Sequence, residues 1–182
     1  MNRMTTAVAL ILAWLPSVPA LAIGELIGGD LSFRGEVVAY PCSIAPDSEQ
    51  VLVDFGEIST KSLYINGKTL PVPFSIKLQD CNPSLLYTVT VKFSGDENLN
   101  LANHLAITPA ASGGASGVGI GLLEADDTPV HLNVATTATT ISNTIMQLNF
   151  KAFLEAEPGA LSNGTLTTGP FTATAYYLLS YQ

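Results

Sequence analysis

The sequence predicts an all-β domain, a sandwich of two packed sheets, from three observations. Apolar and polar residues alternate with a period of two over several stretches, which places successive side chains on opposite faces of a strand. Glycine and proline, 15 and 11 of the 182 residues, divide these stretches by turns. No stretch of comparable length has a helical period. About seven or eight short strands with turns between them are typical of a β-sandwich.

Composition limits both the class of protein and its partners. The chain is 47% hydrophobic and 12% charged, enough apolar material for one core, which excludes a disordered acidic chain. Fifteen acidic residues against seven Lys and Arg give a net charge of -8. That sign is wrong for a protein that neutralises phosphates, so we expect no nucleic-acid partner.

Residues 1–22 have the pattern of a secretory signal peptide. Arg3 precedes an apolar stretch over residues 7–15, and Ala20-Leu21-Ala22 fits the A-x-A form of a cleavage site. The apolar stretch is about nine residues long, whereas a membrane span needs about 20. We therefore expect an exported chain that begins at residue 23.

Export also predicts the state of the two cysteines. An even pair in an oxidising compartment most simply forms one disulfide, here between Cys42 and Cys81. A bridge that closes a loop of about 40 residues lowers the entropy of the unfolded chain, which stabilises the fold by roughly 4 kcal/mol.

The alternation predicts strands in chain order over the following stretches: residues 31–37, 51–55, 72–78, 87–93, 118–122, 145–154 and 171–181. Pro73 predicts that its strand begins at a sheet edge. The period slips near Gln147, which predicts a β-bulge. Residues 109–117 are expected to form a loop, residues 126–143 are polar without a clear core stripe, and Asn163-Gly164 predicts a turn between two strands.

Few side chains are spaced for catalysis or metal binding. His104 and His131, the only histidines, have no second His or Cys at ligand spacing. Asp126-Asp127 is typical of a solvated loop, although paired carboxylates also serve glycoside hydrolysis. The glycines of residues 113–121 lead into a strand and have no Lys-Ser/Thr after them, unlike a phosphate-binding loop. We expect no catalytic residue, metal or cofactor.

Two features go beyond what a self-contained sandwich requires. Residues 23–31 form an apolar segment that contains Gly28 and Gly29 and alternates poorly. The chain ends inside a long apolar strand, followed only by Gln182, which would leave unpaired backbone groups at a sheet edge. An arm that needs a sheet and an edge that needs a strand predict assembly by strand addition.

A set of motifs, taken in order along the mature chain, resembles a known family. They are Asp30-Leu-Ser-Phe-Arg-Gly35, Tyr40-Pro-Cys42, Val53-Asp-Phe-Gly56, Phe74-Ser-Ile-Lys-Leu-Gln-Asp-Cys81, Gly117-Val-Gly-Ile-Gly-Leu122 and the terminal strand 171–181, with Gly169 fourteenth from the end and Tyr181 penultimate. Together with the signal peptide, this pattern resembles the subunits of chaperone–usher fimbriae, the pilins.

The resemblance implies an incomplete immunoglobulin-like β-sandwich that lacks its seventh strand and is completed by donor-strand complementation. A periplasmic chaperone would fill the groove first, an outer-membrane usher would receive the subunit, and the arm of a neighbouring pilin would then replace the chaperone. The product would be a structural, non-enzymatic subunit of a fimbria on the cell surface that supports adhesion. The implied organisation is a signal peptide over 1–22, a donor-strand extension over 23–37 and a pilin domain over 38–182.

The resemblance also implies two sets of site residues. In the family the donor arm carries a glycine seven residues before the first cysteine, which here is Gly35. The donor residues would be Gly29, Leu31, Phe33, Gly35 and Val37. The groove and chaperone-binding edge would comprise Gly169, Phe171, Ala173, Ala175, Tyr177, Leu179 and Tyr181.

Three other classes compete with this interpretation. A secreted carbohydrate-binding, lectin-like sandwich would be a stable monomer without a chaperone. A secreted hydrolase would show turnover that depends on a carboxylate. A tip adhesin would need a further sugar-binding domain, for which the mature chain has no room, and the sequence identifies no host receptor.

Overall fold

A computed structural model describes residues 28–37, 40–110 and 113–182. The chain separates into a unit that ends at Val37 and a unit that begins at Val38, and each is described by itself. The predicted signal peptide over 1–22 and the first arm residues, 23–27, lie outside the described residues. No helix in the described ranges is long and apolar enough to cross a membrane.

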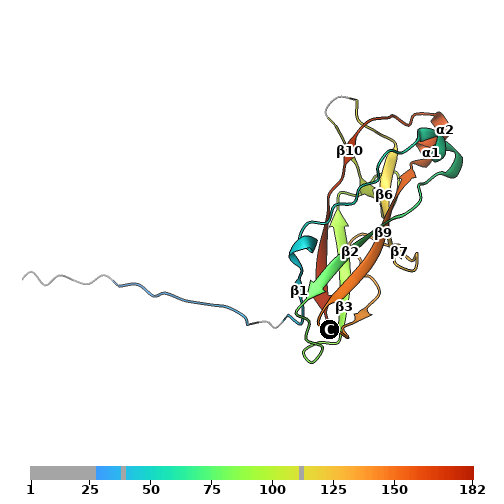
Figure 1. Cartoon of the computed structure of the whole chain (residues 1–182). Coiled ribbons are helices and arrows are strands. Elements are labelled where there is room, and N and C mark those ends of the chain that lie inside the picture. The colour runs from blue at the N-terminus through green and yellow to red at the C-terminus, as the bar shows by residue number, and fades with distance from the viewer. Residues whose placement is uncertain (1–27, 38–39, 111–112) are drawn as a thin grey trace, which may run out of the picture. The chain divides into compact units, whose positions relative to one another are not determined.

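The larger unit is built from antiparallel strands, shown in Figure 1, and the all-β prediction is confirmed. The large sheet has the order β1 (Ser43–Ile44), β2 (Val72–Gln79), β9 (Met146–Ala156), β6 (Val118–Glu124) and β4 (Leu105–Ala106), with β7 (Pro129–Val130) also paired to β6. The second sheet has the order β11 (Ala175–Tyr181), β3 (Thr88–Gly95) and β8 (Thr139–Thr140). A third pairing joins β10 (Phe171–Thr172) to β5 (Thr108–Pro109). The helical elements are η1 (Pro46–Ser48), α1 (Thr60–Asn66) and α2 (Pro158–Asn163).

The core is built from side chains of both main sheets. Ile76 and Leu78 of β2 are completely buried. Phe93 of β3 meets two rings of the large sheet edge-on, with centroids 6.3 Å from Phe74 and 5.0 Å from Phe150. Edge-to-face contacts of this kind add to the free energy gained from burial.

The predicted disulfide is present. Cys42, just before β1, is bonded to Cys81, just after β2, and both residues are buried in the main core cluster. The bridge therefore holds the short edge strand β1 against β2.

The expected strands over 72–78, 87–93 and 118–122 correspond to β2, β3 and β6. Pro73 lies near the beginning of β2, where β1 does not reach, since β1 pairs only with Leu78 and Gln79. Among the described residues, that side of the strand has no neighbouring ladder there, as the proline predicts.

The predicted bulge near Gln147 is wrong. From Met146 to Ala152 the register of β9 on β2 is uninterrupted. The period slips in the sequence only if Ile145 faces the core, whereas Met146 occupies the core face and Ile145 is exposed. The real break in the pattern is Phe153, which is buried on the outer face of the sheet.

The predicted strand over 171–181 is divided into two. β11 pairs with β3, whose last residue, Gly95, is opposite Ala175. Residues before Ala175 therefore have no partner in β3, and β10 pairs instead with β5.

The two short helices were not predicted. α1 has seven residues and α2 six, too few to establish a helical period. Pro158 at the start of α2 and Gly164 after its end are the available signals, because proline favours the first helical turn and glycine the left-handed cap. Asn163-Gly164 thus turns the chain out of a helix and does not join two strands.

Candidate functional site

One side of the sandwich has an incomplete hydrogen-bond ladder. β11 has a single neighbour, β3, so its other edge is free within the described residues. An edge strand presents a row of backbone N–H and C=O groups that can pair with another strand. Figure 1 shows β11 as the long red strand beside β3.

Residues 51–58 have no regular secondary structure, with Gly56 at a φ of 60°, and form the other wall of this open side. The predicted strand over 51–55 is wrong, because these residues have no ladder partner in the described chain, although they keep the predicted alternation of burial. Tyr177 contacts Ser48 at one end, and the ring of Phe55 lies 6.4 Å from that of Phe171 at the other. The two walls therefore run antiparallel. We call the two walls, residues 171–181 and residues 48–58, together with the ladder missing between them, the ladder gap.

The dimensions of a sheet give the width that one missing strand leaves. Neighbouring strands lie 4.7–4.9 Å apart, so strands on either side of a missing strand are about 9.5 Å apart. Backbone hydrogen bonds cannot cross that distance, whereas long side chains that face each other can meet.

Apolar side chains of both walls are only half-buried. They pack against the core but remain partly accessible, and they are Val53, Phe55, Ile58, Phe171, Ala173, Tyr177, Leu179 and Tyr181. Burial, and then the charge of Glu49, raises the pKa of Tyr177. Burial, and then the neighbouring Tyr177, raises the pKa of Tyr181. The inner faces of the walls are thus apolar but incompletely covered.

Two residues predicted for the groove edge differ from the others. Ala175 is exposed and does not pack against the core cluster. Gly169 lies outside any strand with a φ of 141°, and a Cβ there would overlap the carbonyl of Gly113. Close packing and backbone conformation therefore require glycine at position 169.

The predicted donor residues lie in the described unit 28–37. The predicted strand over 31–37 does not form in this unit, and Leu31 and Phe33 are 79% and 85% exposed. Val37 is fully exposed, and a Cβ at Gly29 or Gly35 would meet no atom within 4 Å. Their role as donor residues stays a prediction.

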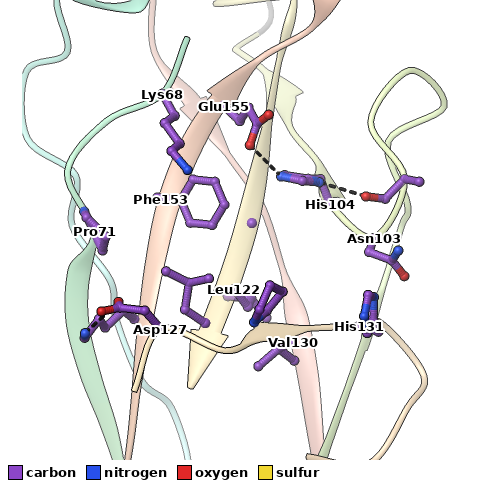
Figure 2. Close-up of a pocket in the computed structure, with 15 residues that line it drawn as sticks. Lys68, Pro71, Asn103, His104, Leu122, Asp127, Val130, His131, Phe153 and Glu155 are labelled. Carbon is purple, nitrogen blue, oxygen red and sulfur yellow. Dashed lines mark hydrogen bonds and ion pairs between the residues drawn. The ribbon is translucent and has the colours of Figure 1, made fainter. Parts of the chain in front are cut away.

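A hollow of about 750 Å³ lies on the outer face of the large sheet, shown in Figure 2. Both histidines line it. The Nδ1 of His104 is 2.9 Å from the carbonyl oxygen of Ala102, and its Nε2 is 3.3 Å from a carboxylate oxygen of Glu155. The ammonium of Lys68 lies 5.4 Å from the centre of the Phe153 ring.

Gly119 and Gly121 explain how these rings fit on the sheet. A Cβ at Gly121 would lie 2.5 Å from Cε1 of Phe153, and one at Gly119 would lie 3.2 Å from Cβ of His104. The glycine-rich motif therefore makes room for the edge-on pair of His104 and Phe153.

Asp126 and Asp127, the pair of adjacent carboxylates, both make structural contacts. The Asp126 carboxylate accepts the backbone N–H of Thr128, which lowers the pKa of Asp126. Asp127 forms an ion pair with Lys151 at 2.7 Å. Among the residues that the structure describes, no three His, Cys, Asp or Glu side chains gather in a way that could hold a metal ion.

A comparison of the sequence with models of protein families shows to which family the chain belongs. Residues 31–182 match the model of a family described as fimbrial protein. The chain belongs to the fimbrial protein family. This family consists of structural fimbrial subunits and not of enzymes, so the predicted fimbrial subunit is confirmed and the lectin-like alternative is not favoured.

Individual relatives of this fimbrial subunit agree. It is 35% identical over 177 residues to PmfF of Proteus mirabilis, named as a minor fimbrial subunit, with 97% of this chain and 96% of that protein covered. It is 37% identical over 154 residues to the Fimbria A protein of Serratia marcescens, with 85% and 84% covered. The crystal structure of the P pilus rod subunit PapA has a TM-score of 0.68 at 24% identity, over 79% of this fimbrial subunit and all of that chain, and it confirms the pilin-like fold.

Proposed function

We propose that this fimbrial subunit polymerises by donor-strand exchange, in which the arm of a neighbouring subunit fills the ladder gap. The observation that carries the proposal is the unpaired edge of β11 beside apolar side chains that remain half-buried. A strand added there would pair the free backbone groups and cover those side chains at once.

The domain boundaries and partners follow from that proposal. Residues 1–22 direct export, residues 23–37 provide the donor strand and residues 38–182 form the sandwich. A periplasmic chaperone occupies the gap until delivery to the outer-membrane usher. The role is mechanical, without catalysis.

The arm supplies apolar side chains with the required spacing. Leu31, Phe33 and Val37 are exposed and share one face by alternation. Full burial of each of these side chains in the ladder gap contributes about 1.5–3 kcal/mol to the free energy of binding. Gly35 is expected to face a position of the ladder gap that has no room for a side chain, and the small Gly29 to fill the first position only loosely.

A synthetic peptide of residues 28–37 tests the proposal. Added to the mature chain, it should protect the amides of β11 and of residues 51–58 from hydrogen exchange. Phe33→Ala in the peptide should raise Kd about 10- to 150-fold, because it removes about 1.5–3 kcal/mol of burial. Arg34→Ala, on the opposite face, should change Kd by less than about threefold. Protection that is absent, or equal sensitivity at both positions, would contradict the proposal.

A further inference from the structure

One side-chain hydrogen bond crosses the ladder gap. The hydroxyl of Tyr177, on β11, donates to the backbone carbonyl of Ser48 at 2.5 Å. Ser48 is the last residue of η1, shortly before residues 51–58. In residues 40–110 and 113–182, no backbone hydrogen bond joins the two walls. The Tyr177 bond therefore ties together walls that no ladder holds.

The Ser48 end of this bond is fixed in place. Ser48 is 2% exposed, and its N–H donates to the carbonyl of Ala45 at 2.8 Å. Its Oγ accepts the backbone N–H of Lys77 at 2.9 Å. The Lys77 ammonium pairs with Asp47 at 2.5 Å, and the hydrogen bond from Lys77 lowers the pKa of Asp47. With this turn anchored to β2, the part free to move is the half-buried side chain of Tyr177.

We propose that Tyr177 is a latch that controls how fast the ladder gap accepts a strand, an inference that rests on the proposed donor-strand exchange. Tyr177 and Ser48 lie on opposite walls, so a strand laid between the walls crosses the line that joins them. The phenol has to release the carbonyl before the ladder can close. The bond exists in the empty subunit and is absent from the filled one. Tyr177 is thus a positioning residue that stabilises the empty state.

This difference between the two states predicts a specific change in rates. Tyr177→Phe keeps the ring and its packing and removes only the donor. Without the bond in the empty state, association of the 28–37 peptide should accelerate about 2- to 12-fold, the range that corresponds to the net worth of one hydrogen bond. Dissociation should be unchanged, because the bond is already broken in the complex.

Tyr176→Phe is the matched control. Tyr176 lies on the same strand but on its exposed face, outside the apolar walls, and its hydroxyl makes no hydrogen bond to any described residue. Both rates should match those of the unmodified chain. An equal effect of the two substitutions would assign the change to the loss of a phenol hydroxyl from β11, not to a latch.

Stopped-flow fluorescence anisotropy with the labelled peptide measures both rates on the full mature chain and the two variants. Faster association in Tyr177→Phe alone supports the latch. Unchanged association, or faster dissociation, overturns it, since Tyr177 would then contact the bound strand. If the peptide binds all three proteins at equal rates, only the latch fails. If it binds none of them, donor-strand exchange fails and the latch fails with it.

Discussion

Gly121 lies on β6 where the ring of Phe153 crosses the strand, and its replacement by alanine is expected to destabilise the domain. The new Cβ would lie 2.5 Å from Cε1 of Phe153 and 2.8 Å from Nε2 of His104. Carbon atoms pack favourably at about 3.5–4.0 Å, so the ring has to move by about 1 Å. Lys68 and His104 flank that ring. Overpacking of this kind costs about 1–3 kcal/mol.

Gly159→Ala is the matched control, because the same methyl group enters open space. Gly159 lies in α2, and a Cβ there would meet no atom within 4 Å. Alanine favours a helix over glycine, so this variant should gain up to about 1 kcal/mol or remain neutral. Phe153→Leu in the Gly121→Ala background should recover part of the loss, since the shorter side chain leaves room for the methyl group.

Equilibrium urea unfolding, followed by circular dichroism, measures the free energies of unfolding. Trp14, in the predicted signal peptide, is the one tryptophan of the sequence, so intrinsic tryptophan fluorescence is not a suitable probe of residues 23–182. A Gly121→Ala variant as stable as the unmodified chain would refute the steric reasoning. So would a double variant in which the two losses simply add, because residues in contact should couple.

Two further predictions concern the disulfide and the tyrosines of β11. Replacing both Cys42 and Cys81, 39 residues apart, by serine should lower the free energy of unfolding by about 4 kcal/mol in the same urea assay; a loss below about 1 kcal/mol would contradict a structural bridge. The folded-state pKa values of Tyr177 and Tyr181 are raised above 10.0, so the folded chain holds their protons longer than the unfolded chain. The stability that these two tyrosines add to the folded state is fully present below pH 10 and is lost as pH rises through their folded-state pKa values. The free energy of unfolding, measured from pH 9 to about 12, should show that decline. In the variant with both tyrosines replaced by phenylalanine the decline should be smaller. Equal slopes of the free energy against pH in the two proteins would exclude these residues as the cause.

The sequence predicted those parts of the fold that depend on alternation. β2 and β6 alternate over most of their length, so their core faces could be assigned. Residues 51–55 alternate equally well and form no ladder, because alternation records which face a side chain occupies and not whether the backbone has a partner. The burial of Phe153 on the outer face depends on two glycines of a neighbouring strand. The contact of Ser48 with Tyr177 depends on residues 129 positions apart, which no local pattern encodes.

The pairing of β11 with β3 has a consequence for the time course of folding. Ala175 pairs with Gly95 and Tyr181 with Val89, so the ladder joins segments that are far apart in the chain. Closing a long loop costs entropy before its contacts form, which makes such pairings slow. Before β11 docks, the edge of β3 that will receive it is also unpaired. The folding chain therefore exposes more unpaired backbone groups than the folded subunit does. The interval between export and the docking of β11 is then the period of greatest risk of aggregation.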